Sequence, residues 1–342
     1  MFSFHPPMPC LVTEASAIVL TSGKSNFNLC EIFINFVEHN YLQTHYAKQN
    51  MIKFATTIDQ QLDLLEQRGL RINDREKAKE ILLDIGYYRL GFYLFPFEKS
   101  FPNLRHRTHE YVTNATFENG VNLYYFDFDM RLLLMRYLNR IEIAFRTALI
   151  YHLSNKHKKS PTWFANPSVV SRTYINKFEE KVYNADFKRT PVIARHHQAY
   201  PNDRFAPAWK TIEFMTFGAV LKLYEELKDH ESKILISNIF GIRQVVTFEN
   251  YMHTILSVRN ACAHGLLLYD FKLPRRIKRG PAKQDQATSG NIIGALRVVK
   301  YIMNSISENR ANEMSENISS LYNALCANTP DLKVLIPDFS TI

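Results

Sequence analysis

Three polar residues near the end of one helical pattern have the types and spacing needed for acid–base chemistry on a phosphate. The segment SVRNACAHG contains Arg259, Asn260 and His264, and Gly265 follows, as expected after the last turn of a helix. Histidine titrates near neutral pH and suits proton transfer. Arginine stabilises charge that develops on a phosphoryl group, and asparagine can orient the imidazole or a ribose. This set suits metal-free RNA cleavage, in which the neighbouring 2′-hydroxyl attacks the phosphate.

Spacing alone does not identify a catalytic pair, because arginine precedes histidine at similar sequence separations in three places. The pairs are Arg146/His152, Arg189/His196 and Arg259/His264. In the alternative interpretation, His264 is a helix-end cation that complements the helix dipole, and Arg259 is surface charge. The sequence has no carboxylate cluster with metal-ligand spacing and no closely spaced cysteine pair. It therefore predicts neither a metal site nor a cofactor.

Helical patterns cover most of the chain and must position these residues. Apolar residues at a 3.6-residue period predict a long helix from about residue 127 to 155, and the candidate site closes a helix at about 244–264. Further helical patterns lie at about 57–69, 74–86, 87–96, 168–185, 207–227, 230–240, 291–308 and 311–327. Loops are expected at 98–115, at 186–206 and at 270–290, the last being basic and mobile. The fold class predicted is all-α.

Composition limits the class of protein. The 342 residues are 46% hydrophobic, which supports a core, and the 11 glycines are too few for a turn-dense β-sandwich. The formal charge of +9 favours an anionic partner. The sequence contains no long apolar run and no positively flanked leader, so it predicts no membrane association. Four scattered cysteines favour reduced thiols in the cytoplasm.

The first fifty residues differ from the rest, since they contain only two lysines and no arginine. We expect residues 1–50 to be a poorly ordered extension, with the native start at Met51. Residues 51–115 are expected to form an N-terminal helical subdomain, residues 116–330 the main domain and residues 331–342 a tail.

Four ordered blocks resemble one bacterial family. They are IDQQLDLLEQRGLRI with KAKEILLDIGYYRLGFYLFPF, FDFDMRLLLMRYLNRIEIAFRTAL, PAWKTIEFMTFGAVLKLY and SVRNACAHGLLLYDF. Over about residues 55–330 the chain resembles the Abi-like family of abortive-infection proteins, the AbiD/AbiF group. The second block matches the family pattern FD..LR followed by E...R.

The resemblance implies a HEPN-like helical bundle in which an R-x4–6-H motif forms an endoribonuclease site. Two such motifs usually face each other, so a chain with one motif is expected to act as a homodimer. Family members are associated with phage defence and toxin–antitoxin modules, and some with a structured non-coding RNA that regulates them. The resemblance thus implies RNA as target and as possible regulator.

Individual positions carry over from the resemblance. Arg259 and His264 match the catalytic pair, with Asn260 beside the arginine. Three charged family positions fall on Glu142, Arg146 and Glu213. In the alternative interpretation, Glu142 and Arg146 form only an i,i+4 pair. Glu213 is expected either to pair with Arg259 or to belong to a packing network.

Aromatic and basic residues complete the expectations. Tyr87, Tyr88 and Tyr93 match aromatic family positions and are interpreted mainly as core, with stacking on RNA bases as the alternative. Cations that would bind RNA are Lys156, Lys158, Lys159, Arg275, Arg276, Lys278 and Arg279. The alternative for these is solvated loop charge.

The sequence thus favours a metal-independent HEPN endoribonuclease of phage defence. One alternative is a non-catalytic RNA-binding module controlled by a structured RNA, for which the basic residues matter and His264 does not. A second is a helical protein that binds another protein.

Overall fold

The computed structural model describes residues 54–283 and 285–342, which belong to one compact unit. The expectations for residues 1–50, including the start at Met51, lie outside this range. Within the described residues the regular elements are helical, and β-structure is limited to isolated bridges such as Arg71 with Thr116. The all-α prediction is confirmed.

Most elements follow one another along the chain with short connections, whereas residues 264–291 join α12 to α13. They are α2 (Ile58–Gln67), α3 (Arg75–Ile85), α4 (Tyr87–Leu94), η1 (Phe95–Phe97), η2 (Leu104–His106), α5 (Phe117–Lys156), η3 (Trp163–Ala165), α6 (Arg172–Lys181), α7 (Ala185–Lys188), α8 (Pro191–Ala199), α9 (Ala208–Thr211), η4 (Ile212–Phe214), α10 (Phe217–Glu225), α11 (His230–Ile239), α12 (Val245–Ala263), α13 (Ile292–Ile306), α14 (Glu308–Asn328), α15 (Leu332–Leu335) and η5 (Phe339–Thr341).

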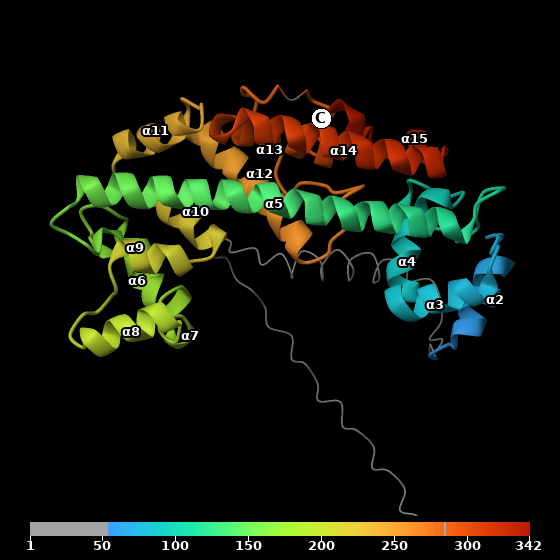
Figure 1. The fold of residues 1–342 in the computed structure, drawn as a ribbon, viewed down its shortest axis with the longest axis horizontal. Helices are drawn as coiled ribbons and strands as arrows, with labels where there is room; N and C mark the ends of the chain where they lie inside the picture. The colour runs from blue at the N-terminus through green and yellow to red at the C-terminus, as the bar shows by residue number, and fades with distance from the viewer. Residues whose placement is uncertain (1–53, 284) are drawn as a thin grey trace, which may run out of the picture. The chain divides into compact units, whose positions relative to one another are not determined.

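The long helix α5 is the element on which the others pack. Figure 1 shows it lengthwise, with α13 and α14 along one side, α12 crossing it and α4 near its N-terminal end. It begins at Phe117, ten residues before the predicted start, after an N-cap at Thr116 that accepts a bond from the Asn119 amide. The first turns show no single apolar stripe, because Phe117 and Phe126, nine positions and so about 180° apart, are both buried. That all-round burial explains why periodicity missed this part of the helix.

Local signals located the N-terminal helices correctly. The capping box at Thr57 is present, with Gln60 N donating to the threonine hydroxyl at 3.3 Å and Gln60 Oε1 accepting from Thr57 N at 2.9 Å. Gly86 separates α3 from α4 with a φ of +86°, which side-chain-bearing residues rarely adopt. The turn at Gly86 sets where α4 begins and so where its polar residues lie.

Two predictions for residues 186–227 are wrong. The segment 186–206, expected to be irregular, contains most of α7 and all of α8, which begins with Pro191 at its first position. The segment 207–227, expected to be one helix, is divided into α9, η4 and α10, and Thr216 caps the last of these. Short helices of one or two turns give too little periodicity to be recognised.

A cluster of aromatic rings joins α5 to α10, α11 and α12. The Phe145 ring is fully buried and lies 5.6 Å from Tyr224, 5.9 Å from Phe248 and 6.3 Å from both Phe217 and Phe240, measured between ring centroids. Such rings contribute strongly to core stability. The cluster fixes the part of α5 that carries Glu142 and Arg146.

The basic loop 270–290 was expected to be mobile, but its described residues are anchored to helices. The Asn250 side chain on α12 donates to Arg276 O at 3.2 Å and accepts from Lys278 N at 2.8 Å. Ile277 is buried between them, and its amide donates to Ser289 O at 2.7 Å.

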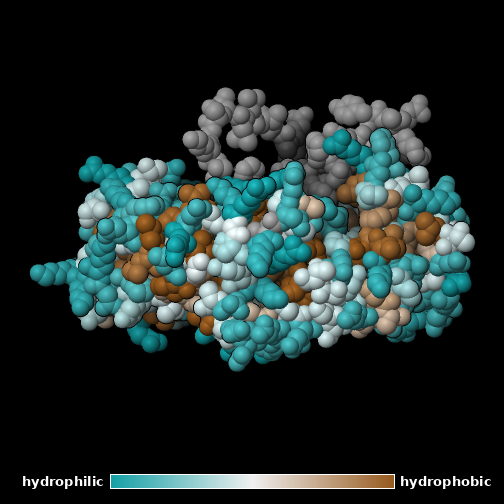
Figure 2. Space-filling view, turned by 90° about the horizontal axis from the view of Figure 1, so that it is seen from above, coloured by the Kyte–Doolittle hydropathy of each residue, from teal (hydrophilic) through white to brown (hydrophobic). Residues whose placement is uncertain are grey.

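Figure 2 shows a face of the molecule on which hydrophobic patches alternate with hydrophilic side chains.

We predict that Gly294→Ala destabilises the protein because α13 passes too close to this loop. A methyl group at residue 294 would lie 2.1 Å from Thr288 O, a backbone atom. We expect a loss of about 2 kcal/mol in the free energy of unfolding, measured by urea denaturation, since overpacking outweighs the helix-propensity gain. Gly290→Ala is the control, because a methyl group there meets nothing within 4 Å. Equal effects of the two substitutions would contradict the prediction.

Candidate functional site

Arg259 lies in the last turns of α12 and faces α5. Its Nε lies 3.4 Å from Glu142 Oε2, an ion-pair distance whose angle does not make a hydrogen bond. Its Nη1 donates to the side-chain oxygen of Asn260 at 3.2 Å. The Arg259 side chain is 31% exposed. The guanidinium is therefore held from one side and open to solvent on the other.

Glu142 is the buried group that links Arg259 to a second arginine. Its Oε1 accepts from Arg146 Nη2 at 2.8 Å, so one carboxylate bridges two guanidinium groups. Glu142 and Arg146 are buried, and Arg146 also donates to Met215 O at 3.0 Å. The predicted i,i+4 pair exists, and it also reaches α12. Since breaking a buried pair leaves an uncompensated charge, the Glu142–Arg146 pair is costly to disrupt, and it places a carboxylate within ion-pair distance of Arg259.

His264 directly follows the last residue of α12 and is exposed. Its amide donates to Asn260 O at 2.9 Å, which places the two residues on one side of the helix end. Gly265 then takes a φ of +66° and turns the chain away. Among the described residues, no side-chain hydrogen bond or ion pair holds the His264 imidazole, so it is accessible for proton transfer.

Exposure distinguishes the three arginine–histidine pairs. Arg146 is buried against Glu142, and the His196 side chain, only 4% exposed, is paired with Asp203. Arg259 and His264 are the pair in which both side chains reach solvent. The burial of Cys262 beside them raises the pKa of its thiol to about 12, which makes it a poor nucleophile at neutral pH.

A second buried carboxylate, Asp127 on α5, anchors the chain that follows His264. Its Oδ1 accepts from Leu268 N at 2.9 Å and from Tyr269 N at 2.8 Å, and its Oδ2 accepts from Tyr93 Oη at 3.0 Å. Arg131, one turn further along α5, forms an ion pair with it. The direction of the chain after Gly265 is therefore set from inside the core.

Burial and charge oppose each other at Asp127. The side chain is fully buried, and this burial raises the pKa of its carboxyl to about 6 although Arg131 and the two amides favour the charged form. Arg131 also donates to Leu266 O at 3.3 Å. Asp127 and Arg131 are thus part of one polar network, in which the Asp127 carboxylate accepts from backbone amides after His264 and Arg131 donates to a backbone carbonyl there.

A third contact comes from α4. Arg89 Nη1 donates to Gly265 O at 3.1 Å, and the Arg89 side chain is exposed. Tyr93 is fully buried as expected, and Tyr87 is partly buried and accepts from Arg68 Nη1 at 3.1 Å. Tyr88 is 66% exposed, so its interpretation as a core residue is wrong. At the first turns of α4, adjacent tyrosines point to different sides of the helix.

Glu213 lies apart from these contacts. It is exposed in η4, and among the described residues it forms no hydrogen bond or ion pair. The carboxylate that pairs with Arg259 is Glu142 instead. Glu213 is nevertheless two residues from Met215, whose carbonyl receives Arg146.

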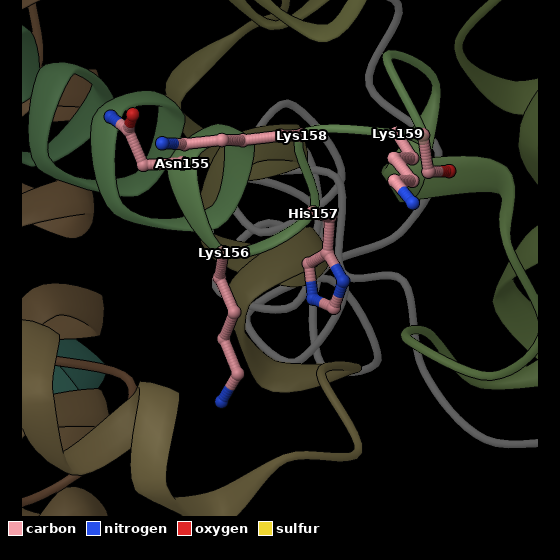
Figure 3. A pocket seen from close by; sticks show the side chains of 6 residues that line it. Asn155, Lys156, His157, Lys158 and Lys159 are labelled. Carbon is pink, nitrogen blue, oxygen red and sulfur yellow. The ribbon is translucent and has the colours of Figure 1, made fainter.

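The lysines at the end of α5 are separate from Arg259. Lys156 pairs with Asp229 at 2.5 Å, while Lys158 and Lys159 are exposed and line a shallow pocket with Asn155, His157 and Ser160. Figure 3 shows that the three lysine side chains point in different directions. Lys156 lies fourteen positions after Glu142 on α5, a distance of roughly 20 Å along the helix.

The basic residues after α12 are also set apart from Arg259. Arg275, Arg276, Lys278 and Arg279 are all exposed. Their segment is fixed to Asn250, which lies nine positions before Arg259 on α12. Nine residues correspond to about 180° of rotation and roughly 13 Å of rise. The structure therefore places this cluster on the far side of α12 from the Arg259 guanidinium.

The family model described as Abi-like protein matches residues 80–270. The chain belongs to the Abi-like family. Neither a curated protein nor a solved structure matches it. The Abi-like region contains Arg259, His264 and the three charged residues Glu142, Arg146 and Glu213, whereas Arg275–Arg279 lie beyond it.

Residues that sequence reasoning missed also lie in the Abi-like region. Asp127 and Arg131 occupy the FD..LR pattern, and Arg89 follows the paired tyrosines of the first block. The i,i+4 spacing of an acidic and a basic residue within that pattern was the sequence signal that could have identified this ion pair.

The described residues contain no group of three or more potential metal ligands and no helix that is both long and apolar enough to cross a bilayer.

We predict that Asp127→Ala destabilises the protein strongly, because it leaves Arg131 and two backbone amides without their acceptor. The expected loss in the free energy of unfolding is about 3–5 kcal/mol, measured by chemical denaturation. Asp129→Ala is the matched control, since Asp129 is exposed on the same helix and should change stability by less than about 0.5 kcal/mol. A loss below about 1 kcal/mol for Asp127→Ala would show that the network is dispensable.

A pH dependence is predicted at the other end of α5. Hydrogen bonds from Lys156 and Ser232 lower the pKa of Asp229 to about 2 from 3.8. A lowered pKa stabilises the fold above pH 3.8, and this contribution is lost as the pH falls towards 2. The difference in melting temperature between the wild type and Asp229→Asn should therefore narrow from pH 5 to pH 3. A constant difference across this range would contradict the predicted pKa.

Proposed function

We propose that this protein is an endoribonuclease that acts in bacterial phage defence, with Arg259, Asn260 and His264 as its site. The observation that supports this most directly is the accessibility of Arg259 and His264 at one helix end, with Arg259 held by the buried Glu142. An arginine can stabilise charge on a phosphoryl group, and an imidazole can transfer protons, so the two groups at this helix end suit RNA cleavage. Membership of the Abi-like family supports the setting in defence against phage.

The proposed reaction is transesterification within RNA. The 2′-oxygen forms a bond to phosphorus while the bond from phosphorus to the 5′-oxygen breaks. One imidazole accepts the 2′-hydroxyl proton, and a second imidazole donates a proton to the leaving 5′-oxygen. The products are a 2′,3′-cyclic phosphate and a 5′-hydroxyl end. Arg259 stabilises the charge on the phosphoryl oxygens, and Asn260 orients the Arg259 side chain.

The second imidazole would come from another copy of the chain. A homodimer of the HEPN type brings two His264 side chains to one cleft, and the exposure of His264 is compatible with this. We place the reaction in the cytoplasm, on host or phage RNA, without a metal ion or cofactor. A structured non-coding RNA is the proposed regulator, as expected for a toxin–antitoxin module.

We predict that His264→Ala abolishes RNA cleavage while the fold is retained. Loss of a general acid or base typically costs 10²–10⁴-fold in rate. The measurement is cleavage of a labelled RNA in EDTA, with detection of the 2′,3′-cyclic phosphate. His106→Ala is the control, because His106 is exposed and outside the site. Full cleavage by purified His264→Ala protein would sink the proposal, and so would cleavage of an RNA whose 2′-hydroxyls are methylated.

A non-catalytic RNA-binding module is the second candidate. It is favoured by the exposed and anchored cations Arg275, Arg276, Lys278 and Arg279, which lie on the far side of α12 from Arg259. In that case His264→Ala leaves phage resistance intact, whereas charge reversal in this cluster removes both RNA binding and resistance.

A further inference from the structure

The two helices that contact the segment directly after His264 each carry an exposed aromatic ring, and the proposed reaction uses neither ring. Gly265 O and Leu266 O are consecutive carbonyls, and each accepts from a different arginine, Arg89 on α4 and Arg131 on α5. Consecutive Cα atoms lie only 3.8 Å apart. The two arginines therefore bring α4 and α5 together at the residues next to His264.

An exposed aromatic residue lies next to each of these arginines, along the chain for Arg89 and in space for Arg131. Tyr88 precedes Arg89 and is 66% exposed, and its ring is supported edge-on by Phe92 at a centroid distance of 5.1 Å. Phe128 is 40% exposed, and the Arg131 guanidinium carbon lies 5.8 Å from the centroid of its ring. Exposed rings supported by other groups are good platforms for stacking, because little side-chain freedom is lost on binding.

Most N–H donors of the Arg89 guanidinium are available to bind a ligand. Its guanidinium carries five N–H donors, and Gly265 O accepts from one nitrogen. Among the residues that the structure describes, no carboxylate lies within ion-pair distance of Arg89, and the side chain is exposed. Arg131, by contrast, is buried and neutralised by Asp127. Arg89 is therefore an uncompensated charge beside His264.

We propose that Tyr88, Arg89 and Phe128 form a subsite for single-stranded RNA on the side of His264 that faces α4. The rings stack on unpaired bases, and Arg89 binds a phosphate adjacent to the one that is cleaved. This inference rests on the proposed ribonuclease function, since it places the RNA at His264. Duplex RNA keeps its bases stacked on each other and cannot use the rings, so the subsite selects single strands.

The experiment measures binding without cleavage, so that it does not depend on catalysis. Full-length His264→Ala protein is titrated into a fluorescein-labelled mixed-sequence RNA of about 20 nucleotides, either single-stranded or paired with its complement. Tyr88→Ala in this background should weaken binding to the single strand about tenfold and leave duplex binding unchanged. Tyr200→Ala is the matched control, because Tyr200 is 58% exposed at the end of α8.

Salt dependence tests Arg89 separately from its contact with Gly265. Arg89→Gln keeps an amide donor for Gly265 O but removes the charge, and should lower the slope of log Kd against log salt by about 0.7. Arg89→Lys should retain the slope, and Arg172→Gln, at an exposed arginine in α6, should not change it. If Arg89 only caps the Gly265 carbonyl and binds no phosphate, Arg89→Gln would lower the melting temperature and leave the slope of log Kd against log salt unchanged.

The outcomes separate this inference from the ribonuclease proposal. If the wild type cleaves RNA but Tyr88→Ala and Arg89→Gln bind it normally, the subsite is refuted and the nuclease stands. If the wild type does not cleave but both variants lose single-strand binding, the subsite stands and the nuclease falls. Conversion of a dimer to a monomer by Tyr88→Ala, measured by analytical ultracentrifugation, would show that the rings contact a second copy instead and would overturn the subsite.

Discussion

The arrangement of the candidate site depends on one buried carboxylate, that of Asp127, and on the hydrogen bonds that it accepts. Asp127 receives the amides of Leu268 and Tyr269, the hydroxyl of Tyr93 and the guanidinium of Arg131. A carboxylate without water around it is unfavourable unless its lone pairs are filled, and here the chain after α12 supplies two of the donors. The position of the segment that begins at His264 is therefore coupled to the satisfaction of a charge in the core.

The same helix holds the other end of the site by the same chemistry. Glu142 and Arg146 repeat the acid–base pair of Asp127 and Arg131 further along α5, and Glu142 reaches Arg259 on α12. Arg259 meets Glu142 and Leu268 meets Asp127, so the chain from the last turns of α12 to Leu268 runs in the direction opposite to α5. Glu142 and Arg146 are buried, whereas the Arg259 and His264 side chains reach solvent.

Sequence patterns predicted what depends on neighbours along the chain. The cap at Thr57, the helix that ends before His264 and the i,i+4 pair of Glu142 with Arg146 are all local, and all are present. The partners of Asp127 could not be predicted, because they are backbone amides about 140 residues further along the chain. The anchoring of the basic loop by Asn250 was missed for the same reason, since an asparagine within a helix gives no sign of its distant partner.

The two ion pairs on α5, Asp127–Arg131 and Glu142–Arg146, also fix the spacing and the relative direction of the groups that they contact. Arg131 and Glu142 are separated by a fixed stretch of helix, and every residue inserted there turns one pair by about 100° relative to the other. A single insertion would thus aim Glu142 away from Arg259 even if no side chain at the site changed. Seven inserted residues would nearly restore the angle but would move the pairs roughly 10 Å further apart. Length variation in this protein is consequently far easier to accommodate in its loops than in the middle of α5.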